Sequence, residues 1–504
     1  MARSAHQPNH NPGIDHGSLL GSNKTAAPTG GICFHGRSRC FLLRHRPGSL
    51  WWIKARLWRE KAKTKNSGLR TKNSKLTARE FARPPPFKLE AASLNVMTLP
   101  LGRIRRFRFN LPQRIAAGLL TLFLIQGLWL TGHQTLTDRD YQYARCGRET
   151  WESPSALAGY YTTCGNIHDG ILAYRVAGLP LTLNVLAERG LDLFRKPENR
   201  VFQQPATGSG ASGLSTWELR HQLPYVLLLL RLPFLLAGCV LGGGLWWVTR
   251  RLYGDLGGYT ALGLYCFSPA VIRACVAPNP EVLAALGVYG GVYTCIGVAH
   301  AMQGPRRKWR PRIVLLTVIF GIAAASHIAA LPVVALLGLA AMLWVAEGHR
   351  SQTLPVVIAA AVGALVLLFV CYGFSPDAFS YVFRSSAGFL RISLDPARRF
   401  FSTLGNAGIT VASGASLVLY LGLRRSRYFG NTAPLLCALV LLVTVMTGVP
   451  GAPWLWALPF LLTFIGGVFA DAYEGPRPRL AIAAGGSVLV LQAVLCVLSL
   501  PGLL

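Results

Sequence analysis

Acidic side chains are scarce in this sequence. Its 504 residues hold 20 Asp and Glu against 51 Lys and Arg, a formal net charge of +31. Charged residues make up only 14% of the chain, whereas an ordinary soluble domain carries roughly 25%. Apolar residues reach 52%, which excludes a chain that is disordered throughout. The composition therefore argues against a single soluble globule and indicates a membrane protein.

Several short signals are also missing. No cysteine pair has the spacing of a zinc site. The Gly-rich stretch Gly208–Gly213 lacks the Lys-Ser/Thr that completes a phosphate loop, so we interpret it as a linker. Outside the first 96 residues, most of the basic excess lies in short clusters between apolar runs, as membrane topology requires. We therefore expect no nucleic-acid partner, although a strongly basic chain first suggests one.

Residues 1–96 differ from the rest of the chain. They hold 18 Lys and Arg against 4 Asp and Glu, and their apolar residues follow no sustained period. We expect a basic, disordered extension ahead of a membrane domain at residues 97–504. Two interpretations stay open: that Met97 is the real start and the extension is not translated, or that the extension is an arm lying on anionic lipid.

From residue 115 onward, apolar runs of membrane-helix length repeat. We predict an all-α polytopic membrane protein with about eleven transmembrane helices and a large first outer-face loop. The stretch 313–346 is too long for one crossing at about 1.5 Å per residue, so we break it near Ser326–Pro332. The predicted spans are 115–132, 232–249, 257–276, 281–302, 313–325, 329–346, 354–374, 406–423, 432–449, 454–472 and 480–500.

Arginine clusters set the predicted orientation. Five arginines precede the first span, which places the N-terminus in the cytoplasm. Loops 133–222 and 375–405 then lie on the outer face, and the second mixes Arg with Phe in a composition suited to a lipid interface. We expect a multi-pass integral protein, in a bacterial inner membrane. The loops that would be inside are the basic ones, at 250–251, 304–312, 349–350, 424–427 and 477–479.

The few acids of the membrane domain are the most informative side chains. Most of them simply solvate an outer-face loop, but one or two could act as a general base or hold a cation at the membrane surface. We take as candidates Glu152 and Glu281, together with Asp138, Asp140 and Asp169.

Three cationic or titratable side chains are further candidates. Arg231 and Arg273 lie near span ends, where arginine either snorkels or binds phosphate through its planar fork. His327 lies in an apolar run, where it is either a buried histidine with a backbone partner or a functional group. Cys146 and Cys164 share the first outer loop, where an oxidising face would allow a disulfide.

A family resemblance follows from the order of several motifs. Arg231-Leu232-Pro233, then Arg250–Gly254 (RRLYG), Gly257–Leu264, Ser268-Pro269 and Glu281 resemble polyprenol-dependent glycosyltransferases of the GT-C type. More narrowly, they are similar to the branch of protein mannosyltransferases and aminoarabinose transferases. Trp454–Leu461 (WLWALPFL) resembles a late helix of that branch. The resemblance covers residues 115–350 and, more loosely, 440–472.

The resemblance implies roles for particular residues. The family's Asp-Glu pair in the first outer loop corresponds to Trp151-Glu152, which retains only the glutamate. A downstream Glu-His-Pro-Pro-like segment corresponds to His168-Asp169, and the acid of the second loop to Glu281. Val276 replaces a frequent Arg, and His327 replaces a frequent Lys.

The function that the resemblance implies is transfer of a sugar from a polyprenyl-phosphate donor at the outer face. A carboxylate takes the proton of an acceptor hydroxyl, and cationic groups stabilise the departing phosphate. Whether a divalent cation takes part stays open. Two alternatives remain: a catalytically inactive relative that binds a lipid-linked glycan or a partner protein, and a secondary transporter. The transporter is disfavoured because the halves show no inverted repeat.

Overall fold

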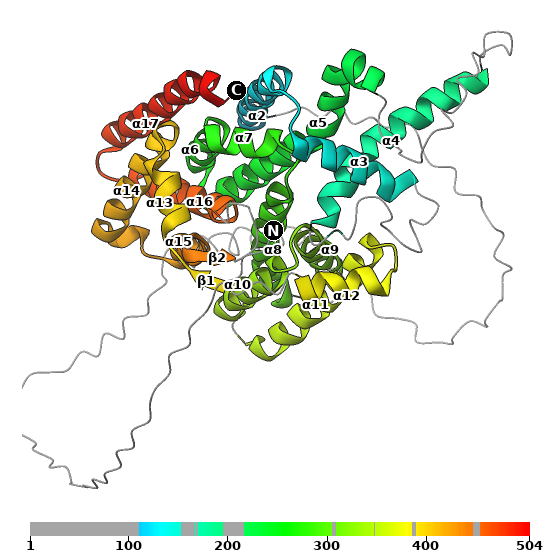
Figure 1. Ribbon diagram of the computed structural model, residues 1–504. Coiled ribbons are helices and arrows are strands. Elements are labelled where there is room, and N and C mark those ends of the chain that lie inside the picture. The colour runs from blue at the N-terminus through cyan, green and yellow to red at the C-terminus, as the bar shows by residue number, and fades with distance from the viewer. Residues whose placement is uncertain are drawn as a thin grey trace, which may run out of the picture. The chain divides into compact units, whose positions relative to one another are not determined.

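The computed structural model describes residues 110–152, 167, 170–194, 216–304, 309–346, 348–385, 390–446 and 454–503 (Figure 1). The predicted extension 1–96 lies outside the described residues. What is described is nearly all helical. The longer helices are α2 (Leu111–His133), α3 (Asp138–Glu152), α4 (Ile171–Phe194), α5 (Thr216–Tyr253), α6 (Asp255–Cys266), α8 (Pro280–Met302), α9 (Arg310–Ser326), α10 (Ala330–Val345), α11 (Arg350–Cys371), α14 (Ala407–Gly422), α15 (Phe429–Val443), α16 (Trp454–Tyr473) and α17 (Pro478–Ser499).

Short elements complete the chain between these helices. They are α7 (Pro269–Val276), α12 (Pro376–Ser385), α13 (Asp395–Ser402), the strands β1 (Leu390–Ile392) and β2 (Thr444–Met446), and the 3-10 turns η4 (Leu404–Asn406), η5 (Arg424–Ser426) and η6 (Pro501–Leu503). The two strands pair antiparallel, with Ile392 opposite Thr444.

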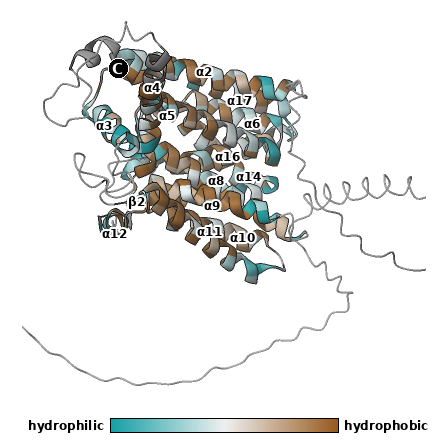
Figure 2. Cartoon of the chain, turned by 90° about the vertical axis from the view of Figure 1, so that its right-hand side faces the viewer, coloured by the Kyte–Doolittle hydropathy of each residue, from teal (hydrophilic) through white to brown (hydrophobic). Residues whose placement is uncertain are grey.

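The helices indicate a multi-pass integral membrane protein, but the predicted count of about eleven spans is not confirmed. In the described residues, 7 helices are long and apolar enough to cross a membrane, or up to 8 if α6 and α7 form one span bent by 63°. The other predicted spans became α9, α10 and α15, of 17, 16 and 15 residues, short of the roughly 20 that a crossing needs. Figure 2 shows apolar residues along the helices and hydrophilic ones on α3.

One predicted helix end changes, and one predicted break is confirmed. The apolar run 432–449 ends as a helix at Val443, and Thr444–Met446 forms strand β2 instead. β-Branched Thr444 and Val445 favour an extended backbone, and β1 supplies the pairing partner. The break predicted near Ser326–Pro332 is confirmed, because α9 ends at Ser326 and α10 begins at Ala330.

The loop predicted at residues 133–222 is more structured than its polarity suggested. Its described part holds α3, α4 and the first turns of α5. The first part of α4, Ile171–Ala187, is apolar. Helices α3 and α4 meet at Gly147 and Gly178, where a Cβ on Gly178 would lie 2.1 Å from the carbonyl carbon of Gly147. Only glycine permits so close an approach of two backbones.

The arginine-rich turns gather at one end of the helices, which we call the arginine end. The hydroxyl of Tyr253 donates to the carbonyl of Gly430, joining the end of α5 to the start of α15. Arg425 of η5 pairs with Glu474, just after α16. These contacts bring together the turns at 250–255, 424–430 and 471–477, as the predicted topology requires.

The opposite ends of the same helices also meet, in a region that we call the acid end. The side chain of Gln134, after α2, donates to the carbonyl of Leu503 in η6 over 3.2 Å. The rings of Phe400 in α13 and Trp454 in α16 stack with their centroids 4.9 Å apart. From Tyr253 to Arg231, α5 rises roughly 33 Å at about 1.5 Å per residue, close to the thickness of a hydrocarbon layer.

One buried amide satisfies the break between α6 and α7. The Nε2 group of Gln492, in α17, donates to the carbonyls of Phe267 and Gly405 over 2.7 and 2.8 Å. Its Oε1 atom accepts from the backbone N–H of Ile409 over 3.1 Å. Backbone groups freed by a helix break need such partners, because hydrocarbon offers none. Gln492 therefore holds three elements together at the acid end.

We expect Gln492→Leu to destabilise the fold, because it leaves three buried backbone groups without a partner. The cost should be on the order of 2 kcal/mol, measured as a lower midpoint of thermal unfolding in detergent. Gln352→Leu, on the exposed side of α11, is the matched control and should leave the midpoint unchanged. Equal midpoints for both variants would contradict the assigned role of Gln492.

Candidate functional site

Glu281 is a buried carboxylate at the acid end. It lies at the start of α8, where Pro280 occupies the first turn and the side chain of Asn279 accepts from the backbone N–H of Glu281 over 3.0 Å. From Glu281 to Met302 the helix rises roughly 31 Å, so the carboxylate and the 304–312 turn lie at opposite ends of α8. Glu281 is 3% exposed, which requires a compensating partner.

His327 supplies that partner. It lies in the break between α9 and α10, with its Nε2 atom 3.2 Å from Oε1 of Glu281, and it is 4% exposed. The contact is an ion pair when the imidazole is protonated. The break itself is closed by turns, since the N–H of Ala330 bonds to the carbonyl of His327 over 2.9 Å. Because α9 ends just before His327, the imidazole ring lies against the carboxylate of Glu281.

Trp456 completes a cluster around His327. It lies in the first turn of α16, and its ring centroid is 5.8 Å from that of His327. Oε2 of Glu281 and Nε1 of Trp456 are buried without a hydrogen-bond partner among the described residues, and Nε2 of His327 lies 3.2 Å from Oε1 of Glu281 without hydrogen-bond geometry. Buried groups of this kind are uncommon and point to water or to a bound group. We call Glu281, His327 and Trp456 the Glu281 cluster.

The residues just before α4 pack beside the Glu281 cluster. Gly170 has φ +78°, and a Cβ there would lie 3.3 Å from Pro280 and 3.4 Å from the carbonyl oxygen of Ser326. Ile167 is buried in an apolar group with Ile328. The predicted candidates His168 and Asp169 lie outside the described residues.

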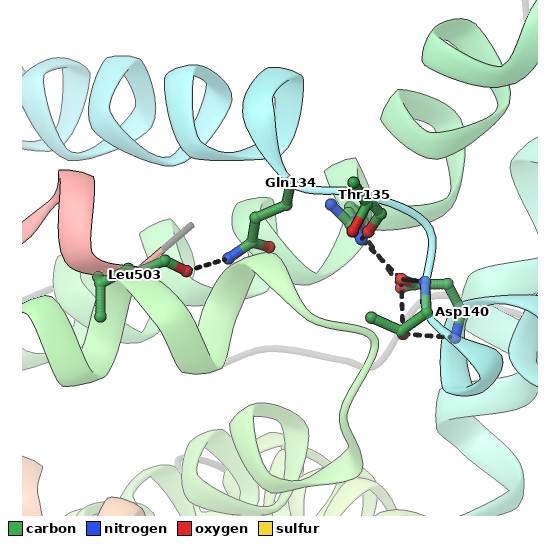
Figure 3. Close-up of polar contacts among 6 residues, drawn as sticks. Gln134, Thr135, Asp140 and Leu503 are labelled. Carbon is green, nitrogen blue, oxygen red and sulfur yellow. Dashed lines mark hydrogen bonds and ion pairs between the residues drawn. The ribbon is translucent and has the colours of Figure 1, made fainter.

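Arg231 is engaged by a protein carboxylate. Its Nη2 and Nε atoms lie 2.6 and 3.3 Å from the two carboxylate oxygens of Asp140, and both side chains are 2% exposed. Nη2 also donates to the carbonyl of Thr135 over 3.1 Å (Figure 3). Asp140 in turn accepts from the N–H and hydroxyl of Thr137 over 3.0 and 2.8 Å. This pair closes the turn from α2 to α3, so we assign it a structural role.

Glu152 lies in different surroundings from Glu281. Its carboxylate forms a two-pronged pair with Arg148, both distances being 2.9 Å, and accepts from the hydroxyl of Thr182 over 3.0 Å. Thr182 is twelve residues beyond Gly170 on α4, roughly 18 Å along the axis. The structure therefore brings Glu281 and His327 together, and places Glu152 further along α4.

The remaining candidates are at the surface. Asp138 is exposed at the start of α3, and Arg273 is exposed on α7. Cys146, in α3, is disulfide-bonded, whereas Cys164 lies outside the described residues. Within the described part of the chain, no group of three His, Cys, Asp or Glu side chains could hold a metal ion.

Trp456 was missed by sequence reasoning. A tryptophan in an apolar run normally indicates packing, and nothing in the local sequence shows that its indole N–H lacks a partner. The pairing of Asp140 with Arg231 was missed as well, because 91 residues separate them.

Comparisons with known proteins leave the site to be judged on its own geometry. No family model, curated protein or solved structure matches the chain.

We expect Asp140→Asn to destabilise the protein by about 3–5 kcal/mol, because it leaves the Arg231 guanidinium buried without a counter-charge. Asp138→Asn, two residues away and exposed, removes only a helix-terminus charge and should cost at most about 1 kcal/mol. Thermal unfolding of the two variants in the same detergent measures the difference. A similar loss in both would contradict the structural role of the Asp140–Arg231 pair.

Proposed function

We propose that this protein is a membrane glycosyltransferase of GT-C type, which transfers a sugar from a polyprenyl-phosphate donor at the outer face of the membrane. The observation that carries the proposal is two buried polar atoms without a hydrogen-bond partner among the described residues, Oε2 of Glu281 and Nε1 of Trp456. Both residues neighbour His327, Glu281 through Oε1 at 3.2 Å and Trp456 with ring centroids 5.8 Å apart. A hydroxyl group suits such a pair, because it donates to a carboxylate and accepts from an indole N–H.

The orientation of the chain supports an outer-face site. The Glu281 cluster lies at the acid end, away from the turns that carry Arg250, Arg425 and Arg427. With those turns in the cytoplasm, the N-terminus is cytoplasmic and the cluster faces outward. The disulfide at Cys146, in α3, fits an oxidising compartment on the same side. A bacterial inner membrane provides both conditions.

The proposed reaction needs a base and a cation. Oε2 of Glu281 accepts the proton of the acceptor hydroxyl while that oxygen bonds to the anomeric carbon of the donor sugar. The bond from the anomeric carbon to the phosphate oxygen breaks, and polyprenyl phosphate leaves with the electron pair. Arg273, exposed on α7 shortly before α8, is available to the phosphate, whereas Arg231 is held by Asp140. His327 lies beside the Glu281 carboxylate, with its Nε2 atom 3.2 Å from Oε1.

The direct test is sugar transfer from a polyprenyl-phosphate sugar by the full chain in proteoliposomes. Glu281→Gln should lower the rate by about 100-fold or more, because it removes the general base. Asp377→Asn changes an exposed carboxylate on α12 and should leave the rate unchanged.

Glu152→Gln extends the test to the other predicted acid. A loss of activity there would return Glu152 to the mechanism, and an unchanged rate would leave it in a pair with Arg148. Full activity of Glu281→Gln would refute the assigned role of Glu281.

A second candidate is a non-catalytic relative that binds a lipid-linked glycan or a partner protein. Two side chains that the resemblance placed in the site form ion pairs within the protein, which favours this candidate. Arg231 pairs with Asp140, and Glu152 pairs with Arg148. This candidate predicts that purified protein retains a polyprenyl-phosphate sugar without turning it over. Detectable transfer that depends on Glu281 excludes it.

A further inference from the structure

A segment of the predicted outer-face loop 375–405 contacts the elements around the Glu281 cluster. Residues 376–404, which we call the interfacial segment, comprise α12, β1, α13 and the start of η4. Val382 of α12 is fully buried in the apolar group that contains Ile328, the neighbour of His327. Phe400 of α13 stacks on Trp454, two residues before Trp456. The segment is therefore fixed to the two elements that carry His327 and Trp456.

The same segment exposes large apolar side chains. Ile392 is 87% exposed, Leu394 66% and Leu404 76%. Exposed apolar groups of this kind mark an interaction surface when they cluster. Ile392 and Leu394 lie in and just after β1, outside every candidate membrane span, whereas Leu404 lies in η4 and begins the candidate span Leu404–Gly422.

Arginines accompany these apolar side chains. Arg384, Arg398 and Arg399 are exposed, and in the described part of the chain Arg398 and Arg399 make no ion pair. The interfacial segment holds four arginines against two aspartates in the sequence, and Asp395 accepts from the hydroxyl of Ser393 over 3.2 Å. Apolar side chains beside unpaired arginines are the composition of a surface that lies in the headgroup layer.

We propose that the interfacial segment is inserted into the leaflet at the acid end, with Ile392, Leu394 and Leu404 among the acyl chains and Arg398 and Arg399 on anionic lipid phosphates. A lipid surface fits better than a protein partner, because the segment lies where α11 ends and where α14 and α16 begin. Inserted in this way, it sets the headgroup layer level with the Glu281 cluster. The proposal holds whether or not the protein transfers sugars.

Depth measurements on the full chain in vesicles test the insertion. Nitroxide labels are placed by Ile392→Cys and Leu404→Cys, with Asp377→Cys as the control on α12, and the signal of labelled wild type is subtracted. We expect the labels at 392 and 404 to collide more often with oxygen than with a water-soluble nickel chelate, and the label at 377 to show the reverse. Preferred collision with the chelate at 392 and 404 would overturn the proposal. Protection from both reagents would also overturn it, in favour of a protein partner.

A second arm tests the anionic headgroups. In vesicles containing phosphatidylglycerol, the double variant Arg398→Gln, Arg399→Gln should move the label at 392 toward water, and in pure phosphatidylcholine it should have no effect. An equal depth in both lipids, with or without the arginines, would contradict the headgroup contact.

Discussion

Hydrocarbon offers no hydrogen bonds, so each polar group placed among these helices needs a partner within the protein. That constraint governs the places where the helices stop. Gln492 satisfies the break between α6 and α7, and the Asp140–Arg231 pair closes the turn between α2 and α3. At both points several partners converge on one side chain, although Nη1 of Arg231 has no hydrogen-bond partner among the described residues. Such sites stabilise the fold.

The Glu281 cluster differs because its acid is only partly hydrogen-bonded, whereas both carboxylate oxygens of Asp140 have partners. Glu281 is as deeply buried as Asp140, yet one of its carboxylate oxygens and the indole N–H of Trp456 have no partner among the described residues. Partly satisfied polar groups in a low-dielectric interior are costly, and they persist where a function needs them. The contrast between the two buried acids therefore separates a structural ion pair from a candidate binding site, although both lie at the same end of the helices.

The apolar runs of the sequence were a good guide to the helices and a weaker guide to their lengths. Each predicted run contains a helix, because apolar length is a local property. Where a helix ends depends on partners elsewhere: strand β1 pairs with Thr444–Met446 beyond α15, and Gln492 satisfies a backbone carbonyl at the break before Ser268-Pro269. Helix α4 was missed because its apolar residues were averaged into a long polar loop.

Candidate residue types were found more readily than their pairing. Glu281, His327, Arg231 and Asp140 were all singled out from the sequence. Their partners depend on tertiary packing, which joined Arg231 to Asp140 and left Glu281 beside His327. From the sequence, Arg231 was a candidate to snorkel or to bind phosphate, and in the structure it pairs with the carboxylate of Asp140. The unpartnered indole of Trp456 leaves no trace in the sequence at all.

The most direct measurement is an experimental density map of the protein in lipid with a polyprenyl-phosphate sugar bound. The account predicts a sugar hydroxyl within hydrogen-bond distance of Oε2 of Glu281 and Nε1 of Trp456, with the phosphate toward Arg273. A donor sugar bound away from these three side chains, with the Glu281 cluster filled by water alone, would contradict it.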